Sequence, residues 1–164
     1  MVKALSMIPP SIAVLTVFAF LLPFLQVSCN AAPEEPFVIT GMNMVTGTTL
    51  EDFESDEDPT EGEVDPQVFA ILALAFMLLC AATMGTGAGR AAAQVAFGLL
   101  SLLSLIALAW KIHHELSDEG MNQFVGYKLM FGYYLAVVLS VLQVAAGAAR
   151  LVIQRPADRA AEQT

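Results

Sequence analysis

Four apolar stretches alternate with polar segments along this chain, and each stretch is about as long as a membrane crossing. A transmembrane helix needs roughly 20 consecutive apolar residues. The stretches cover about residues 7–27, 66–84, 91–112 and 127–153, and the segments that follow them are 28–65, 85–90, 113–126 and 154–164. The pattern predicts an all-α membrane protein, an antiparallel four-helix transmembrane bundle that forms one domain over residues 1–164.

The distribution of charge favours a membrane bundle over a soluble one. A helix on the surface of a soluble bundle carries a polar stripe with the 3.6-residue period. Residues 66–89, 91–110 and 129–149 contain no charged side chain. The hydrophobic fraction of 57% also exceeds the roughly 45–50% of soluble domains.

Prolines and an acidic residue indicate where the predicted helices begin and end. Asp65 followed by Pro66 fits an N-cap and the first position of the second helix. Pro23 is expected to kink the last turn of the first helix, and Pro156 is expected to stop the fourth. The glycine-containing segment 85–90 is predicted to be a tight inner turn.

Basic residues give the predicted orientation, because short loops rich in Lys and Arg stay in the cytoplasm. With the N-terminus inside, the cytoplasmic side carries a net charge of +3, from Lys3, Arg90, Arg150, Arg155 and Arg159 against Asp158 and Glu162. The first outer segment carries −11, and the second carries −1 when Lys111 and Lys128 at the adjoining helix ends are counted with it. Trp110, Tyr127, Tyr133 and Tyr134 fall near the outer helix ends, where aromatic residues collect in membrane proteins. Both termini are therefore predicted to be cytoplasmic.

The first outer segment, residues 28–65, is predicted to be a mostly irregular loop with two parts. β-branched residues broken by glycine between 37 and 50 indicate short strands or a hairpin. The segment holds eleven of the sixteen acidic residues and no Lys or Arg, with the acids concentrated after residue 50. Its expected partners are a basic protein surface or divalent cations.

Five acidic residues of this segment match the spacing of a calcium-binding EF-hand loop. They are Asp52, Glu54, Asp56, Asp58 and Glu63. Glu57, however, occupies the position that requires glycine for the sharp turn of that loop. We therefore predict a solvated acidic face and no specific metal site, with weak contacts to divalent cations as the alternative.

Small and polar residues recur on single faces of the third and fourth predicted helices. Helices in lipid associate through close approach of small residues and through interhelical hydrogen bonds. The predicted packing residues are Gly98, Ser101, Gly132, Ala136, Ser140, Gln143 and Gly147. Gln94 and Gln143 are expected to hydrogen-bond between helices, and the alternative is that they line a substrate or ion path.

Little in the sequence indicates catalysis. No phosphate loop, Cys/His metal cluster or serine nucleophile motif occurs, and the net charge of −9 argues against nucleic acid. The only histidines, His113 and His114, would point about 100° apart on a helix. We predict no enzyme activity and no cofactor, although a redox subunit built on these histidines and Cys80 is an alternative.

Two short motifs surround the start of the outer segment: Leu22-Pro23-Phe24-x-x-Val27-Ser28-Cys29 and Thr40-Gly41-x4-Thr46-Gly47. Together they run from Leu22 to Gly47 and resemble a pattern in small uncharacterised bacterial inner-membrane proteins. The resemblance implies a four-helix protein of the bacterial inner membrane with a structured first outer loop and no known activity. The topology also resembles that of claudins, but the tryptophan and cysteine signature of their first loop is absent.

The beginning of the chain allows a second interpretation. Lys3, an apolar stretch and Cys29 are arranged as in a bacterial lipoprotein signal, which is cleaved before a cysteine that is then lipidated. Gln26 occupies the position where that signal requires an aliphatic residue. We therefore prefer an intact first span.

Together these patterns predict a non-catalytic integral membrane protein. It is expected to act through its helix faces and acidic loop, as an accessory or assembly subunit of another membrane protein or as a homo-oligomer. The alternative is a small pore or transporter in which the acidic loop attracts cations to the mouth.

Overall fold

The computed structural model describes residues 2–29, 32–49, 63–83, 88–118 and 125–161 of the chain. In chain order its elements are α1 (Val2–Ala19), β1 (Pro23–Cys29), β2 (Ala32–Thr40), α2 (Gly41–Thr46), β3 (Thr48–Thr49), β4 (Glu63–Val64), α3 (Val68–Ala82), α4 (Ala88–Asp118), β5 (Val125–Leu129) and α5 (Phe131–Ala161). The prediction of a mostly helical chain is confirmed.

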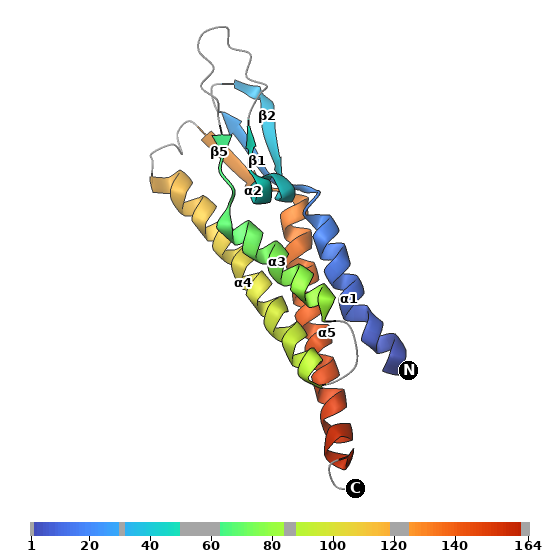
Figure 1. Ribbon diagram of the computed structural model, residues 1–164. Helices are drawn as coiled ribbons and strands as arrows, with labels where there is room; N and C mark the ends of the chain where they lie inside the picture. Colours follow the sequence, from blue (N-terminus) through green and yellow to red (C-terminus); the bar gives the residue numbers. More distant parts are fainter. Residues whose placement is uncertain (1, 30–31, 50–62, 84–87, 119–124, 162–164) are drawn as a thin grey trace.

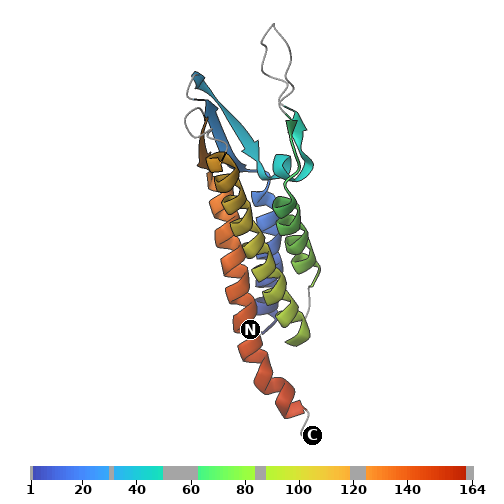
Figure 2. The same cartoon turned by 90° about the vertical axis from the view of Figure 1, so that its left-hand side faces the viewer.

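The four long helices α1, α3, α4 and α5 lie side by side as a bundle (Figure 1). Helix α1 packs against α3 and α5, and α4 packs against the same two helices. Neighbouring helices run in opposite directions. Because α1 and α4 each pack against α3 and α5, α1 lies diagonally opposite α4, and α3 lies diagonally opposite α5. Both termini lie at one end of the bundle and the strands lie beyond the other end (Figures 1 and 2).

A three-stranded antiparallel sheet, in the order β2-β1-β5, covers the end of the bundle opposite the termini. In its register Leu25 pairs with Ile39 and Leu129, and Val27 pairs with Phe37 and Tyr127. Side chains alternate between the two faces of a strand, so these apolar residues share one face. That face joins the hydrophobic core at the head of the bundle.

The opposite face of the sheet is more polar and more open. Gln26 pairs with Val38 and Lys128 across the three strands. Val38 and Lys128 are exposed, whereas Leu25 and Ile39 on the first face are buried. The sheet therefore packs its apolar face against the core at this end of the bundle and leaves its other face open.

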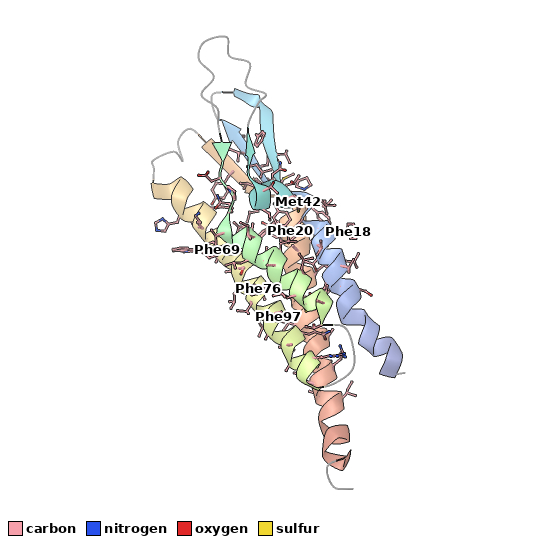
Figure 3. The ribbon with its side chains drawn as sticks, in the orientation of Figure 1. Phe18, Phe20, Met42, Phe69, Phe76 and Phe97 are labelled. Carbon is pink, nitrogen blue, oxygen red and sulfur yellow. The ribbon has the colours of Figure 1, made fainter. Side chains whose placement is uncertain are left out.

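Aromatic rings fill the core where the helices meet the sheet. The rings of Phe20 and Phe24 have centroids 5.0 Å apart, and Tyr133 meets Phe24 edge-on at 6.2 Å. Phe76 of α3 and Phe97 of α4 stack at 6.4 Å along the side of the bundle (Figure 3). These contacts join α1, β1 and α5 in one cluster and fasten α3 to α4.

Two glycines allow close approach where the helices turn into the sheet. A Cβ atom on Gly132, at the start of α5, would lie 2.6 Å from the carbonyl oxygen of Pro23. A Cβ atom on Gly41 would lie 2.9 Å from the Cα of Phe20. Both distances are below van der Waals contact, so these positions have no room for a side chain.

The sheet overturns several predicted boundaries. The first helix ends at Ala19 and not near residue 27, because Pro23 opens strand β1 instead of kinking a helical turn. Proline is tolerated as the first residue of a strand. Tyr127 belongs to β5 and not to the fourth helix, and the third helix continues to Asp118.

Two more boundary predictions are wrong. Helix α3 has Gln67 as its N-cap residue, and not Asp65. Pro156 lies inside α5, which continues to Ala161. The predicted strands between residues 37 and 50 are found only in part, since 41–46 form α2.

Removal of residues 1–28, as a lipoprotein signal requires, would delete α1 and most of β1. It would take with them Phe20 and Phe24, which are essentially fully buried.

Two helices in the described part of the chain are long and apolar enough to cross a membrane. These candidate spans are Gly89–His114, with 26 residues, and Phe131–Ile153, with 23. Helix α3 is apolar but has only 15 residues, which is about 22 Å at the helical rise. By length and composition, membrane association therefore rests on α4 and α5.

We predict that Gly132→Ala lowers the free energy of unfolding by about 1–3 kcal/mol, because overpacking forces the β1 backbone away from α5. Gly89→Ala is the matched control, since a Cβ atom at Gly89 meets nothing within 4 Å. It should leave stability unchanged or slightly higher, as alanine favours helix. Chemical unfolding of the purified variants, followed by circular dichroism, measures both; equal losses would contradict the close approach.

Candidate functional site

Polar side chains are buried along the inside of the helix bundle. Among the described residues, the buried polar or charged ones are Thr16, Gln94, Ser101, Ser104, Ser140, Gln143 and Arg150. Cys80 is buried beside two of them. We name Cys80, Thr83, Gln94, Gln143 and Arg150 the inner polar cluster, because they lie toward the end of the bundle that holds the termini.

The buried hydroxyl groups outside this cluster are all used in bonds to backbone carbonyls. Ser101 of α4 donates to the carbonyl oxygen of Ala73 on α3 at 3.2 Å. Thr16, Ser104 and Ser140 each donate to the carbonyl four residues earlier in their own helix, at 2.7–2.9 Å. Through such bonds a hydroxyl group inside an apolar bundle keeps its donor hydrogen paired.

The amide of Gln94 connects three helices. Its Oε1 accepts a hydrogen bond from Arg150 of α5 at 2.7 Å, and its Nε2 donates to the carbonyl oxygen of Thr83 at 3.2 Å. Thr83 is the C-cap residue of α3. The last carbonyls of a helix have no partner within the helix, so this bond satisfies one of them with a side chain from α4.

Helix α4 also holds the other end of α3. Nζ of Lys111 donates to Oε1 of Gln67 at 3.0 Å, and Gln67 is the N-cap residue of α3. The part of α4 from Gln94 to Lys111 and the segment from Gln67 to Thr83, which contains α3, differ in length by one residue. Two polar side chains of α4 are therefore spaced to match the two ends of α3.

Cys80 and Gln143 meet across the centre of the bundle. The Sγ of Cys80 donates to the carbonyl oxygen of Gln94 at 3.6 Å, and Nε2 of Gln143 donates to the same sulfur. Helices α3 and α5 are diagonal partners, so this contact crosses the bundle axis. Oε1 of Gln143 is buried and has no hydrogen-bond partner among the described residues.

The structure buries all seven predicted packing residues, but they make different contacts. Gly98 lies against Cγ2 of Val144, and Gly147 lies against Cγ2 of Val95, so α4 and α5 each fit a valine to a glycine of the other. Ala136, Ser140, Gln143 and Ser101 are inside the bundle. Gly132 lies against Pro23 and Phe24 of strand β1 and against Leu22 just before it, instead of against a helix face.

Both glutamines bond between helices, as expected, but not to each other. Gln94 joins Thr83 and Arg150, whereas Gln143 joins Cys80.

The two histidines lie at the opposite end of the bundle from the inner polar cluster. Nδ1 of His113 is 2.5 Å from the hydroxyl oxygen of Tyr127 on β5, and His114 meets the ring of Trp110 edge-on at 5.2 Å. Within the described ranges, no group of three His, Cys, Asp or Glu side chains could hold a metal ion. Asp52, Glu54, Asp56 and Asp58 lie outside the described residues, and only the backbone of Glu63 is described.

Comparison with known proteins gives no match to a family model, a curated protein or a solved structure. The resemblance carried by the two short motifs therefore stays a prediction.

The charge pattern predicts that Arg150, near the end of the fourth predicted helix, faces the cytoplasm, and it does not predict that the side chain is buried. Its side chain is only 3% exposed. The sequence does carry a signal, because Gln143, Gly147 and Arg150 follow one another at spacings of four and three. Arg150 thus continues the small-residue face of α5 for one more turn.

We predict that Gln94→Leu lowers the free energy of unfolding by about 1.5–3 kcal/mol, because it removes a hydrogen bond to a charged group and leaves the Thr83 carbonyl unpaired. Ser104→Ala is the control; its hydroxyl bonds only to its own helix, so its loss should cost less, about 0.5–1 kcal/mol for one net hydrogen bond. In a double-mutant cycle, Gln94→Leu and Arg150→Met should be strongly non-additive. Additive losses would mean that the two side chains act independently.

Proposed function

We propose that this chain is a non-catalytic membrane protein whose four long helices cross a bilayer and whose sheet presents the acidic segment to a partner outside. Three features support the proposal. All four helices have exposed apolar side chains, and most polar groups inside the bundle are hydrogen-bonded. The third feature is the outer head, by which we mean the sheet β2-β1-β5 together with α2 and the paired strands β3 and β4.

Apolar side chains are exposed on every helix of the bundle, including α1 and α3, which are not among the two candidate spans. Leu15 of α1 is 55% exposed, Leu78 of α3 is 52%, Leu103 of α4 is 60% and Val138 of α5 is 54%. Soluble monomers rarely expose large continuous apolar surfaces. A lipid environment around all four helices would remove this cost.

Exposed aromatic side chains lie near the sheet end of the bundle. Trp110 is close to the outer end of α4, while Phe131 and Tyr134 begin α5, and all three are strongly exposed. Aromatic residues of this kind concentrate at the boundary between lipid and water. We place the outer membrane surface at this level.

The positions of the termini fit the orientation expected from charge. They share one end of the bundle (Figure 1), where Arg90 lies in the first turn of α4, and Arg155 and Arg159 precede the C-terminus in the sequence. The acidic segment is attached to the other end. By the positive-inside rule we place the termini in the cytoplasm and, for a bacterial protein, the bundle in the inner membrane.

The outer head holds the ends of the acidic segment in place, and this observation carries the proposal of partner binding. Strand β3 pairs with β4, joining Thr48 to Val64 and Thr49 to Glu63. Residues 50–62, between these paired strands, include seven acids and no basic residue. The N–H of Gln67 donates to the carbonyl oxygen of Met44 at 2.7 Å, which ties the base of this segment to α2.

A pore is less well supported by the geometry. Gln94, Ser101, Ser140 and Gln143, which the pore alternative places along a path, are at most 1% exposed. Between them and the sheet, the bundle is filled by Phe20, Phe24, Leu105, Leu108 and Tyr133, all buried. A continuous polar path would have to cross this apolar core.

An active site built on Cys80 and the histidines is also disfavoured. Cys80 bonds the carbonyl of Gln94 near the start of α4, whereas His113 lies close to the other end of that helix. The separation of Gln94 from His113 is roughly 28 Å along the helix axis, far beyond the reach of side chains that must act together.

We predict that partner capture depends on the acidic segment. Changing the seven acids of residues 51–61 to Asn or Gln should abolish the crosslinking of a partner in membranes, while the amount of membrane-inserted protein stays the same. Asp158→Asn with Glu162→Gln is the control, because these two acids lie near the C-terminus, far from the acidic segment in the sequence. Equal crosslinking by the neutralised variant, or recovery of this chain alone as a monomer, would refute the proposal.

A further inference from the structure

We propose that the inner polar cluster binds a water molecule at Oε1 of Gln143, at the centre of the helix bundle. The inference concerns the interior of the bundle and is independent of the partner-binding role proposed above.

Oε1 of Gln143 is a buried hydrogen-bond acceptor without a donor among the described residues. The side chain of Gln143 has no exposed surface, and its Oε1 has no hydrogen-bond partner in the described part of the chain. A buried amide oxygen without a donor is costly, and nearly all buried polar atoms in native proteins have a partner, either protein or ordered water.

Within the inner polar cluster, the thiol and amide donors bond other acceptors, and no donor of the described residues reaches Oε1 of Gln143. The thiol of Cys80 donates to the carbonyl of Gln94, and Nε2 of Gln94 donates to the carbonyl of Thr83. Arg150 donates to the other end of the Gln94 amide. A donor for Oε1 of Gln143 must therefore come from a bound molecule.

Burial restricts that molecule to something very small. Cys80, Gln94, Ser140 and Gln143 are each at most 1% exposed. Water is the smallest hydrogen-bond donor, and a buried water typically makes about three hydrogen bonds to polar groups. Ser140 precedes Gln143 by one turn on the same face of α5, and its oxygen keeps lone pairs that can accept a second hydrogen from the water.

Radiolytic footprinting of the purified wild-type protein, read by mass spectrometry, tests the proposal. A short X-ray pulse splits bound water into hydroxyl radicals in place, and these oxidise neighbouring sulfur atoms. Met77 is fully buried one turn from Cys80 on the same face of α3, and Met44 is buried in the outer core. Because both are methionines, their intrinsic reactivities cancel, and we expect Met77 to be oxidised several-fold faster than Met44.

Two variants assign the water to Gln143. Gln143→Leu removes the unmet acceptor at similar volume and should lower the oxidation rate of Met77 to that of Met44. Ser104→Ala, whose hydroxyl bonds only its own helix, should keep the fast rate. The proposal is overturned if Met77 is as slow as Met44 in the wild type, a comparison that does not depend on the variant's folding. It is equally overturned if Gln143→Leu leaves Met77 oxidation fast.

Discussion

Side chains of α4 bond the residues at both ends of the short helix α3, and this pairing sets how the two helices lie against each other. A helix in an apolar environment needs partners for its terminal N–H and C=O groups. Gln94 and Lys111 of α4 reach the residues at the two ends of α3. Arg150 in turn orients the Gln94 amide, because it occupies Oε1 and leaves Nε2 for α3.

This arrangement divides the bundle into two halves with different chemistry. Toward the sheet, aromatic and aliphatic side chains from the four long helices, α2, β1 and β2 make one core. Toward the termini, the centre is polar and its contacts are hydrogen bonds between helices. The half near the sheet packs the strands onto the helices, while the half near the termini bonds the helices to one another.

The sequence predicts the helices and their buried faces well, because both depend on local periodicity. The predicted packing residues of α5, from Gly132 to Gly147, share one face at helical spacing, and all of them are buried. The end of the first helix could not be predicted in this way. The segment from Leu22 to Val27 is apolar enough to continue a helix, but it forms β1 because β2 and β5 pair with it, and β5 follows only after α4 in the chain. The burial of Arg150 could not be predicted from its charge, which is typical of the cytoplasmic end of a helix, although its spacing continues the buried helix face.

Spin-label accessibility in lipid bilayers tests most directly whether lipid surrounds all four helices. Nitroxides placed singly at Leu15, Leu78, Leu103 and Val138 should collide readily with dissolved oxygen and poorly with a water-soluble nickel complex. A label at Lys128, on the exposed face of the sheet, should show the reverse. Strong nickel access at Leu15 or Leu78, with protection at Leu103 and Val138, would leave only two membrane-spanning helices and contradict the four-helix arrangement.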